Sequence, residues 1–311
     1  MPRKGAGTAQ PVGAAVGRAR RDRDGSCSEL CMVKVTILGC GDAFGAAGRF
    51  HSAYLVETPQ ATFLVDCGPT ILQALKRLRI DPERIDAVVV SHLHGDHFGG
   101  LPFLFMQYRY EAPRTRPLAV YGPPGIGART QKLFEALYEK SAHEPMNFPL
   151  TYQELTPGTP QTLADVRVLP FAVQHVSELC CMGYRFEVDG RVLVYSGDSA
   201  WTDDFITHAR GADLFLCECS TFEPEVPIHI SYREIAAHAR DIDCRRIVLT
   251  HLGAETLRRQ REISLDCARD GMTLELAGTR QVSPRARPVA PRTDARRRPK
   301  GASRGRARRT R

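Results

Sequence analysis

The sequence predicts one α/β domain with a metal site at the ends of its strands, flanked by two disordered tails. Short apolar runs rich in β-branched residues alternate with amphipathic helical patterns between residues 32 and 282. A histidine-rich loop directly follows one of these runs, from His92 to His97. Residues 1–31 and 283–311 show no apolar periodicity, so we expect no packed structure in them.

Composition places the chain among ordinary globular proteins. It has 311 residues, of which 42% are hydrophobic and 25% are charged. No apolar run approaches the roughly 18–20 residues of a membrane span, and the basic N-terminus lacks the apolar core of a secretory signal. We therefore expect a cytoplasmic protein with no membrane association, whose ten cysteines are reduced thiols.

The net charge of +8 comes from basic tails on either side of an acidic domain. Residues 283–311 contain twelve Lys or Arg and one Asp, and residues 32–282 carry a net charge of −6. The C-terminal tail is predicted either to bind polyanions through counterion release or to be merely solubilising. The N-terminal extension, 1–31, is rich in Gly, Ala and Arg, and Met32 is a candidate for the true start.

In the first half of the domain, apolar alternation predicts a strand over 33–38, and a Gly-rich turn follows it. The same patterns then predict strands at about 53–57 and 61–66, a helix at about 70–79, a buried strand over 87–90, a helix over 98–108, a strand over 118–121 and a helix at about 126–140. His143 is expected in a surface loop after that helix.

In the second half, a strand over 166–173 precedes His175. Alternating runs over 182–188 and 191–195, joined by Asp189-Gly190, predict a β-hairpin that ends just before Asp198. The remaining patterns predict a helix near 202–209, a strand over 214–218, a helix over 231–240, a strand over 247–249 and a last strand at about 272–276. His208 and His238 fall in the helices and are expected on the surface.

The loop after the 87–90 strand has the residues of a metal site. Three imidazoles and one carboxylate occupy six positions, and both groups suit Zn²⁺ and its first-row neighbours. Alternate residues of a loop can turn toward one point, so His92 and His94 are predicted to face one metal, and Asp96 and His97 a second. Four ligands exceed the three that one catalytic zinc needs, which favours two ions. Gly99-Gly100 would allow close backbone packing behind the loop.

The run His92-Leu93-His94-Gly95-Asp96-His97 resembles the HxHxDH signature of the metallo-β-lactamase superfamily. The resemblance spans about 32–281 and implies an αββα sandwich with two metals at one edge of the sheets. Its ligand order implies seven metal ligands in this chain: His92, His94, Asp96, His97, His175, Asp198 and His251. Asp198 would bridge the two ions, a hydroxide shared by the ions would be the nucleophile, and Asp96 would accept its proton. Asp66 would support the metal loop.

Two further features resemble the ribonuclease Z branch of this superfamily. Glu218, followed by His229-Ile230-Ser231, looks like its phosphodiesterase pair, in which His229 donates to the scissile phosphate and Glu218 orients it. The Gly-rich turn 39–45 with Arg49 could hold a phosphate, or it could be a plain connector. One feature departs: the long basic arm found in many bacterial members is missing, because only the hairpin separates His175 from Asp198.

The resemblance therefore implies a phosphodiester hydrolase with two Zn²⁺ ions, for which Mn²⁺ or Fe²⁺ could substitute. The first function it implies is tRNA 3′ processing, so RNA would be a partner. A phosphodiesterase for small molecules or cyclic nucleotides, which also lacks the arm, is the alternative. A carboxylic ester, lactone or thioester hydrolase is a third candidate, and a metal-bearing RNA-binding protein without catalytic activity is a fourth. A homodimer is a further expectation.

Overall fold

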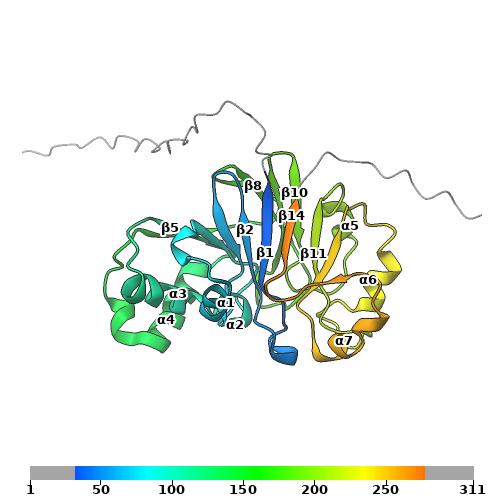
Figure 1. Cartoon of the computed structure of the whole chain (residues 1–311), viewed down its shortest axis with the longest axis horizontal. Coiled ribbons are helices and arrows are strands. Elements are labelled where there is room, and N and C mark those ends of the chain that lie inside the picture. The colour runs from blue at the N-terminus through cyan, green and yellow to red at the C-terminus, as the bar shows by residue number, and fades with distance from the viewer. Residues whose placement is uncertain (1–31, 277–311) are drawn as a thin grey trace, which may run out of the picture. The chain divides into compact units, whose positions relative to one another are not determined.

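The computed structural model describes residues 32–276, which fold as two seven-stranded mixed sheets packed face to face between two layers of helices (Figure 1). This confirms the expected αββα sandwich. The predictions for 1–31, for 277–282 and for the basic tail 283–311 lie outside the described residues. No helix among residues 32–276 has the length and apolar character needed to cross a membrane.

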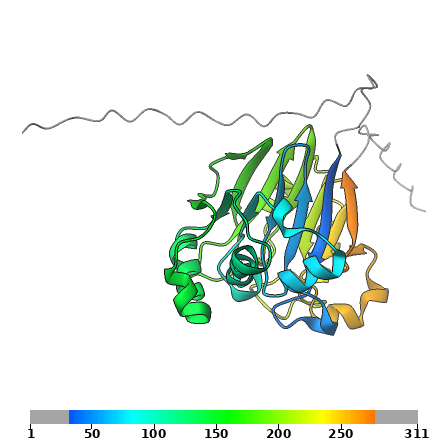
Figure 2. The ribbon, with the colours of Figure 1, turned by 60° about the vertical axis from the view of Figure 1, so that its left-hand side comes forward.

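The first sheet has the strand order β14-β1-β2-β3-β4-β5-β6. Its strands are β1 Val33–Gly39, β2 Ala53–Glu57, β3 Thr62–Val65, β4 Ala87–Val89, β5 Leu118–Gly122, β6 Leu150–Glu154 and β14 Thr273–Leu276. The strand at the end of the domain pairs antiparallel with the strand at its beginning, with Val33 opposite Leu276. Figure 2 shows this pairing, with the orange β14 beside the blue β1. Pairing from β3 to β6 is parallel, and this places the loops after these strands at one edge.

The second sheet has the order β13-β12-β11-β10-β9-β8-β7. Its strands are β7 Gln161–Leu163, β8 Val166–Ala172, β9 Met182–Val188, β10 Arg191–Tyr195, β11 Leu214–Glu218, β12 Ile247–Thr250 and β13 Asp266–Cys267. The hairpin over 182–188 and 191–195 is confirmed with its predicted bounds, and Asp189 and Gly190 both have positive φ. Pairing is parallel from β10 to β13.

Three buried apolar clusters hold the layers together. The central one lies between the sheets, where the rings of Phe63 and Phe186 meet with centroids 5.4 Å apart. A second cluster lies under the helices of the first sheet: α1 Ile71–Leu78, α3 Leu101–Met106 and α4 Ile126–His143. A third lies under α5 Asp204–His208 and α6 Tyr232–His238 on the second sheet. Burying apolar surface on both faces of both sheets is the main favourable term for such a sandwich.

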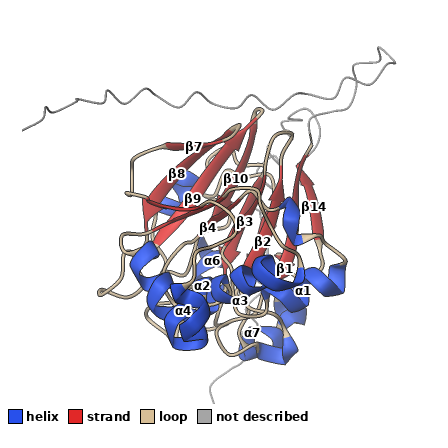
Figure 3. Cartoon of the chain, turned by 90° about the vertical axis from the view of Figure 1, so that its left-hand side faces the viewer, coloured by secondary structure: helices blue, strands red, loops and turns tan. Residues whose placement is uncertain are grey.

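The helices gather toward one end of the strands (Figure 3). The short helices α2 Gly95–Phe98 and α7 Ala254–Arg258 lie at this end and follow directly on strands of the two sheets, β4 and β12. The chain segments that carry the expected metal ligands therefore leave the two sheets on the same side.

Several predicted elements have different bounds in the structure. The helix expected over 98–108 is divided into α2, α3 and a π-helical turn over Gln107–Glu111, because Gly99 and Gly100 interrupt it. His143 is the last residue of α4 and not part of a loop, although it is exposed as expected. His208 and His238 lie at the surface as expected but are half-buried there, because their rings stack on Phe171 and Trp201 at centroid distances of 3.9 and 4.5 Å.

Candidate metal centre

The loop that follows β4 is held against the segment that follows β3 by close backbone packing. The N–H groups of Cys67 and Gly100 donate to the carbonyls of His97 and Cys67. A Cβ atom on Gly100 would lie 2.3 Å from the carbonyl oxygen of Gly68, so no larger residue fits there. The expected role of Gly99-Gly100 in close packing is therefore confirmed, and this packing orients α2 and its ligands toward the second sheet.

Three imidazoles form a first group: His92, His94 and His175. The Nδ1 atom of His94 lies 3.1 Å from the Nε2 atoms of both His92 and His175, although His175 comes from the loop after β8. This spacing matches two nitrogen ligands that each lie about 2.0–2.1 Å from one zinc ion. Burial lowers the pKa of His92 well below its ordinary value, which keeps this imidazole neutral and its lone pair free for a cation.

Two imidazoles and two carboxylates form a second group: Asp96, His97, Asp198 and His251. The Nε2 atom of His97 lies 3.2 Å from an oxygen of Asp96 and 3.2 Å from Oδ2 of Asp198. The Nε2 atom of His251 lies 3.3 and 3.2 Å from the same two oxygens. Asp198 also connects the two groups, because its Oδ2 lies 3.9 Å from Nε2 of His92.

Two polar atoms in the second group have charged neighbours but no hydrogen bond among the described residues. Oδ1 of Asp198 and Nε2 of His97 are buried, and neither makes a hydrogen bond. Burial lowers the pKa of His97, but the charges of Asp198, Asp96 and Asp66 outweigh burial and raise it well above its ordinary value. Buried carboxylates of this kind require positive charge beside them. The seven predicted ligands thus converge on one place and fit divalent cations in chemistry and spacing.

Asp66 supports the second group from beneath, as expected. It is fully buried at the end of β3 and accepts a hydrogen bond from Nδ1 of His97 at 2.7 Å, which leaves Nε2 facing the ligand cluster. The backbone N–H and hydroxyl of Ser91 also donate to it, at 2.7 and 2.9 Å. The hydroxyl of Tyr195, on β10 of the other sheet, donates at 2.7 Å. No sequence motif points to Ser91 or Tyr195, so these two contacts of Asp66 are not predictable from the sequence.

Glu218 and His229 form a pair beside both groups. Nδ1 of His229 lies 3.1 and 3.2 Å from the two oxygens of Glu218, and the His229 ring stacks on that of His251 at 5.5 Å. Glu218 is fully buried at the end of β11 and also accepts the backbone N–H of Ser199. Burial lowers the pKa of His229, but its hydrogen bond to Glu218 and the charge of Glu218 raise it above the ordinary value overall.

The Gly-rich turn after β1 and Arg49 have partners within the protein. The guanidinium of Arg49 donates to the carbonyl of Ala268 at 2.7 Å and to the thiol of Cys40 at 2.9 Å. Asp42 accepts the N–H groups of Phe44 and Ala46 through its side chain. These contacts favour the connector interpretation of the turn over phosphate binding.

Comparison with known proteins agrees with this geometry. Residues 33–268 match the family model described as anti-Pycsar protein Apyc1. The chain belongs to this family. It is 34% identical to the uncharacterized protein ML1173 of Mycobacterium leprae over 234 residues, which cover 73% of this chain and 80% of that protein. It is 30% identical to the probable metallo-hydrolase YhfI of Bacillus subtilis, over 71% of this chain and 87% of YhfI.

More distant relatives identify the branch. A ribonuclease Z of Methanothermobacter thermautotrophicus is 27% identical over 76% of this chain and 92% of that enzyme. The crystal structure of YhfI matches with a TM-score of 0.65 and 25% identity, covering 79% of this chain and 99% of YhfI. The short form of human tRNase Z has the same fold, with a TM-score of 0.65 over 78% of this chain and 99% of that one. This member of the Apyc1 family is a metallo-hydrolase of the metallo-β-lactamase superfamily, in its ribonuclease Z-like branch.

Proposed function

We propose that this protein hydrolyses phosphodiesters with two divalent cations, Zn²⁺ in the first place and Mn²⁺ or Fe²⁺ as substitutes. His92, His94, His175 and Asp198 would hold one ion, and Asp96, His97, Asp198 and His251 the other. The observation that carries the proposal is the Glu218–His229 hydrogen bond beside both groups, at 3.1 Å. The same pair is the feature by which the sequence resembles the phosphodiesterase branch and not the lactamase or lactonase branches of the superfamily.

The chain's own residues divide the chemistry between them. When bound, the two cations would neutralise the phosphate and lower the pKa of an attacking water. His229, whose pKa is raised by Glu218, would hold a proton on its ring and give it to the leaving oxygen. Glu218 would fix the orientation of that ring. Asp96, which faces both His97 and His251, would accept the proton of the water.

The charge around the site supports a small phosphodiester as substrate, including a cyclic nucleotide. The segments that carry the ligands and His229 contain no Lys or Arg; they are 91–108, 174–184, 196–209, 218–232 and 250–257. Beyond the proposed ligands they include Glu178, Asp203, Asp204 and Glu225, and also Glu223 and Glu255, which form ion pairs with Arg259. A protein that holds RNA places Lys and Arg on several phosphates around its site. Between His175 and Asp198 the chain has only the short hairpin β9–β10, in place of the long basic arm of many bacterial ribonucleases Z.

Processing of tRNA 3′ ends is the second candidate, and one observation favours it. The archaeal relative that is named ribonuclease Z aligns over 92% of its own length. In this case the Lys and Arg residues of 283–311 would supply the contacts to RNA that the site segments lack.

A substrate panel on the full-length, metal-loaded protein tests these proposals. We expect turnover of bis-p-nitrophenyl phosphate and of a 3′,5′-cyclic nucleotide, but not of a lactone or a thioester. Turnover of the carbonyl substrates alone would overturn the phosphodiesterase assignment. Specific cleavage of precursor tRNA that is lost when 283–311 is deleted would show that the substrate is RNA and not a small phosphodiester. Metal analysis of the same sample should give two ions per chain.

Location and assembly complete the proposal. All eight cysteines among the described residues are free thiols, which fits the proposed cytoplasmic location. The proposed homodimer can be tested by sedimentation of the full-length protein.

A further inference from the structure

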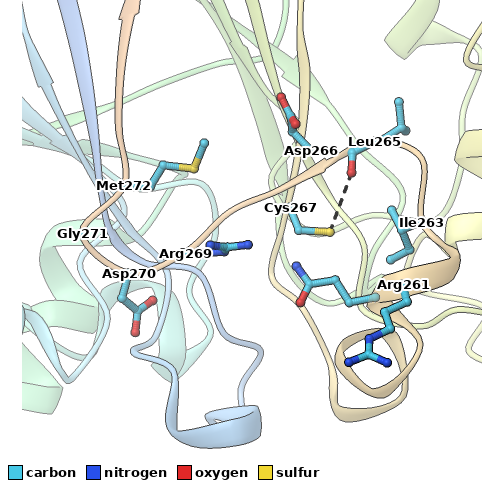
Figure 4. A pocket seen from close by; sticks show the side chains of 10 residues that line it. Arg261, Ile263, Leu265, Asp266, Cys267, Arg269, Asp270, Gly271 and Met272 are labelled. Carbon is cyan, nitrogen blue, oxygen red and sulfur yellow. Dashed lines mark hydrogen bonds between the residues drawn. The ribbon is translucent and has the colours of Figure 1, made fainter.

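A cavity of about 810 Å³ lies at the open edge of the sandwich, away from the ligand groups. The strands β13 and β14 are the edge strands of the two sheets on this side, and residues 268–272 connect them. The cavity is formed by this connection and by the segment that precedes β13 (Figure 4). None of the seven proposed metal ligands, and neither Glu218 nor His229, lines it.

Two arginines supply unneutralised positive charge to this cavity. Figure 4 shows the side chain of Arg269 between the turn at Asp270–Met272 and Cys267, with Arg261 on the far side of the opening. Neither guanidinium makes an ion pair or a hydrogen bond within the described part of the chain. Both are exposed, so their donors are available to a ligand.

The two acidic residues that line the cavity already have partners. Asp266 forms an ion pair with Arg246, with Nε and Oδ2 2.7 Å apart. Asp270 accepts the backbone N–H groups of Cys40 at 3.2 Å and Phe50 at 2.9 Å. These carboxylates are therefore turned to other partners, and the charges left for a ligand are those of Arg261 and Arg269.

The walls between the charges are apolar. Met272 packs against the apolar cluster between the two sheets, while Ile263 and Leu265 pack against the cluster under α5 and α6. All three are partly exposed where they line the cavity. The side chain of Gln260 adds a neutral donor and acceptor. Apolar walls with a few polar groups, in a volume between about 300 and 1,000 Å³, are typical of sites for small molecules.

We propose that this cavity is a second ligand site, for a small anion with an apolar or aromatic body. The charges of both arginines would attract the anion, and the nearer guanidinium would bind its phosphate, sulfonate or carboxylate through charge-assisted hydrogen bonds. Ile263, Leu265 and Met272 would contact its apolar part. The site is independent of the metal centre, so the inference does not rest on the proposed hydrolysis.

The test uses 8-anilinonaphthalene-1-sulfonate, which joins a sulfonate to an aromatic body and becomes fluorescent when bound. We expect one equivalent to bind the full-length, metal-loaded protein, and inorganic phosphate and AMP to compete with it. The double variant Arg261→Gln/Arg269→Gln should bind the dye about tenfold more weakly or worse. The matched control, Arg240→Gln/Arg258→Gln, removes two exposed arginines that do not line the cavity, and it should bind like the wild type.

Equal binding by the two double variants would overturn the proposal, as would the absence of stoichiometric binding to the wild type. Thermal unfolding shows whether each variant is folded, and turnover of bis-p-nitrophenyl phosphate should be the same in both. Because dye binding is read without catalysis, failure of this site and failure of the proposed hydrolysis are distinguishable.

Discussion

The hydroxyl of Tyr195 in the second sheet donates to Asp66 in the first sheet, with Oη and Oδ2 2.7 Å apart. The same carboxylate oxygen accepts Nδ1 of His97 at 2.7 Å. One buried carboxylate therefore links a strand of one sheet to a proposed metal ligand that follows a strand of the other. The orientation of the His97 ring depends on both sheets being in place.

Replacing Tyr195 by Phe removes one donor from Asp66 without changing the shape of the core. We expect metal affinity or turnover to fall about 10–100-fold, as is usual when a partner of a ligating histidine is disturbed. The control is Tyr184→Phe on the adjacent strand β9, since the Tyr184 hydroxyl donates to the carbonyl of Val90 and not to Asp66. If the two variants lose metal and activity equally, Tyr195 has no special effect on the centre.

Substitutions of the Glu218–His229 pair are predicted to lower turnover without removing the metal. His229→Ala should keep its metal content and lose about 10²–10⁴-fold in turnover, because it removes the proposed proton donor. Glu218→Gln should lose less, since the ring stays but the charge that raises the His229 pKa is gone. Metal content by emission spectrometry and kcat for bis-p-nitrophenyl phosphate are the measurements. Unchanged kcat in His229→Ala would remove this residue from the mechanism.

Asp198 is predicted to be shared between the two ions. Asp198→Asn should therefore reduce the metal content below two ions per chain and abolish most turnover, because a carboxamide cannot bridge two cations with the same charge. Asp203→Asn, an exposed carboxylate five residues later, is the control and should retain two ions. Retention of both ions by Asp198→Asn would contradict the bridging role.

His208 predicts a pH dependence of stability that is separate from the metal centre. Burial against Phe171 lowers the pKa of His208, because the charged ring is disfavoured there. The stabilisation is present above the unfolded pKa of about 6.5 and is lost as the pH falls through the lower folded value. In His208→Phe, which keeps the ring stacking, Tm should fall less between pH 7.5 and pH 5 than in the wild type.

The control for this experiment is His143→Gln, at the exposed end of α4, whose Tm should follow the wild-type pH dependence. A His208→Phe variant with the same fall in Tm as the wild type would show that His208 does not contribute to acid sensitivity.

Elements with strong local patterns were predictable from the sequence. The hairpin 182–188/191–195 was predictable because Asp-Gly is one of the few residue pairs that favour the positive φ values of a tight turn. Asp189 and Gly190 have positive φ in the structure. The ligands His92 to His97 were found because they crowd a loop after a buried strand. His175, Asp198 and His251 could be assigned only through the family resemblance, since no local signal links residues so far apart along the chain.

Other features could not be predicted because they depend on contacts between distant segments. Residues 151–154 of the strand β6 are exposed and show no apolar alternation, so only the pairing with β5 defines this strand. Tyr195 has the pattern of an ordinary core residue, and its hydroxyl gains a role only because β10 lies opposite Asp66. The half-burial of His208 and His238 could not be predicted, because helical periodicity does not show the rings of Phe171 and Trp201 on which they stack.

The two groups of ligands have a consequence for how the protein matures. The histidine-rich loop is synthesised first, but His251 emerges from the ribosome about 150 residues later, and β14 closes the first sheet only after that. A nascent chain that has reached residue 200 has at most six of the seven proposed ligands and lacks the edge strand beside β1. Stable loading of the two proposed ions would therefore await near-complete translation, and premature termination would release a polypeptide with exposed imidazoles and an unpaired sheet edge.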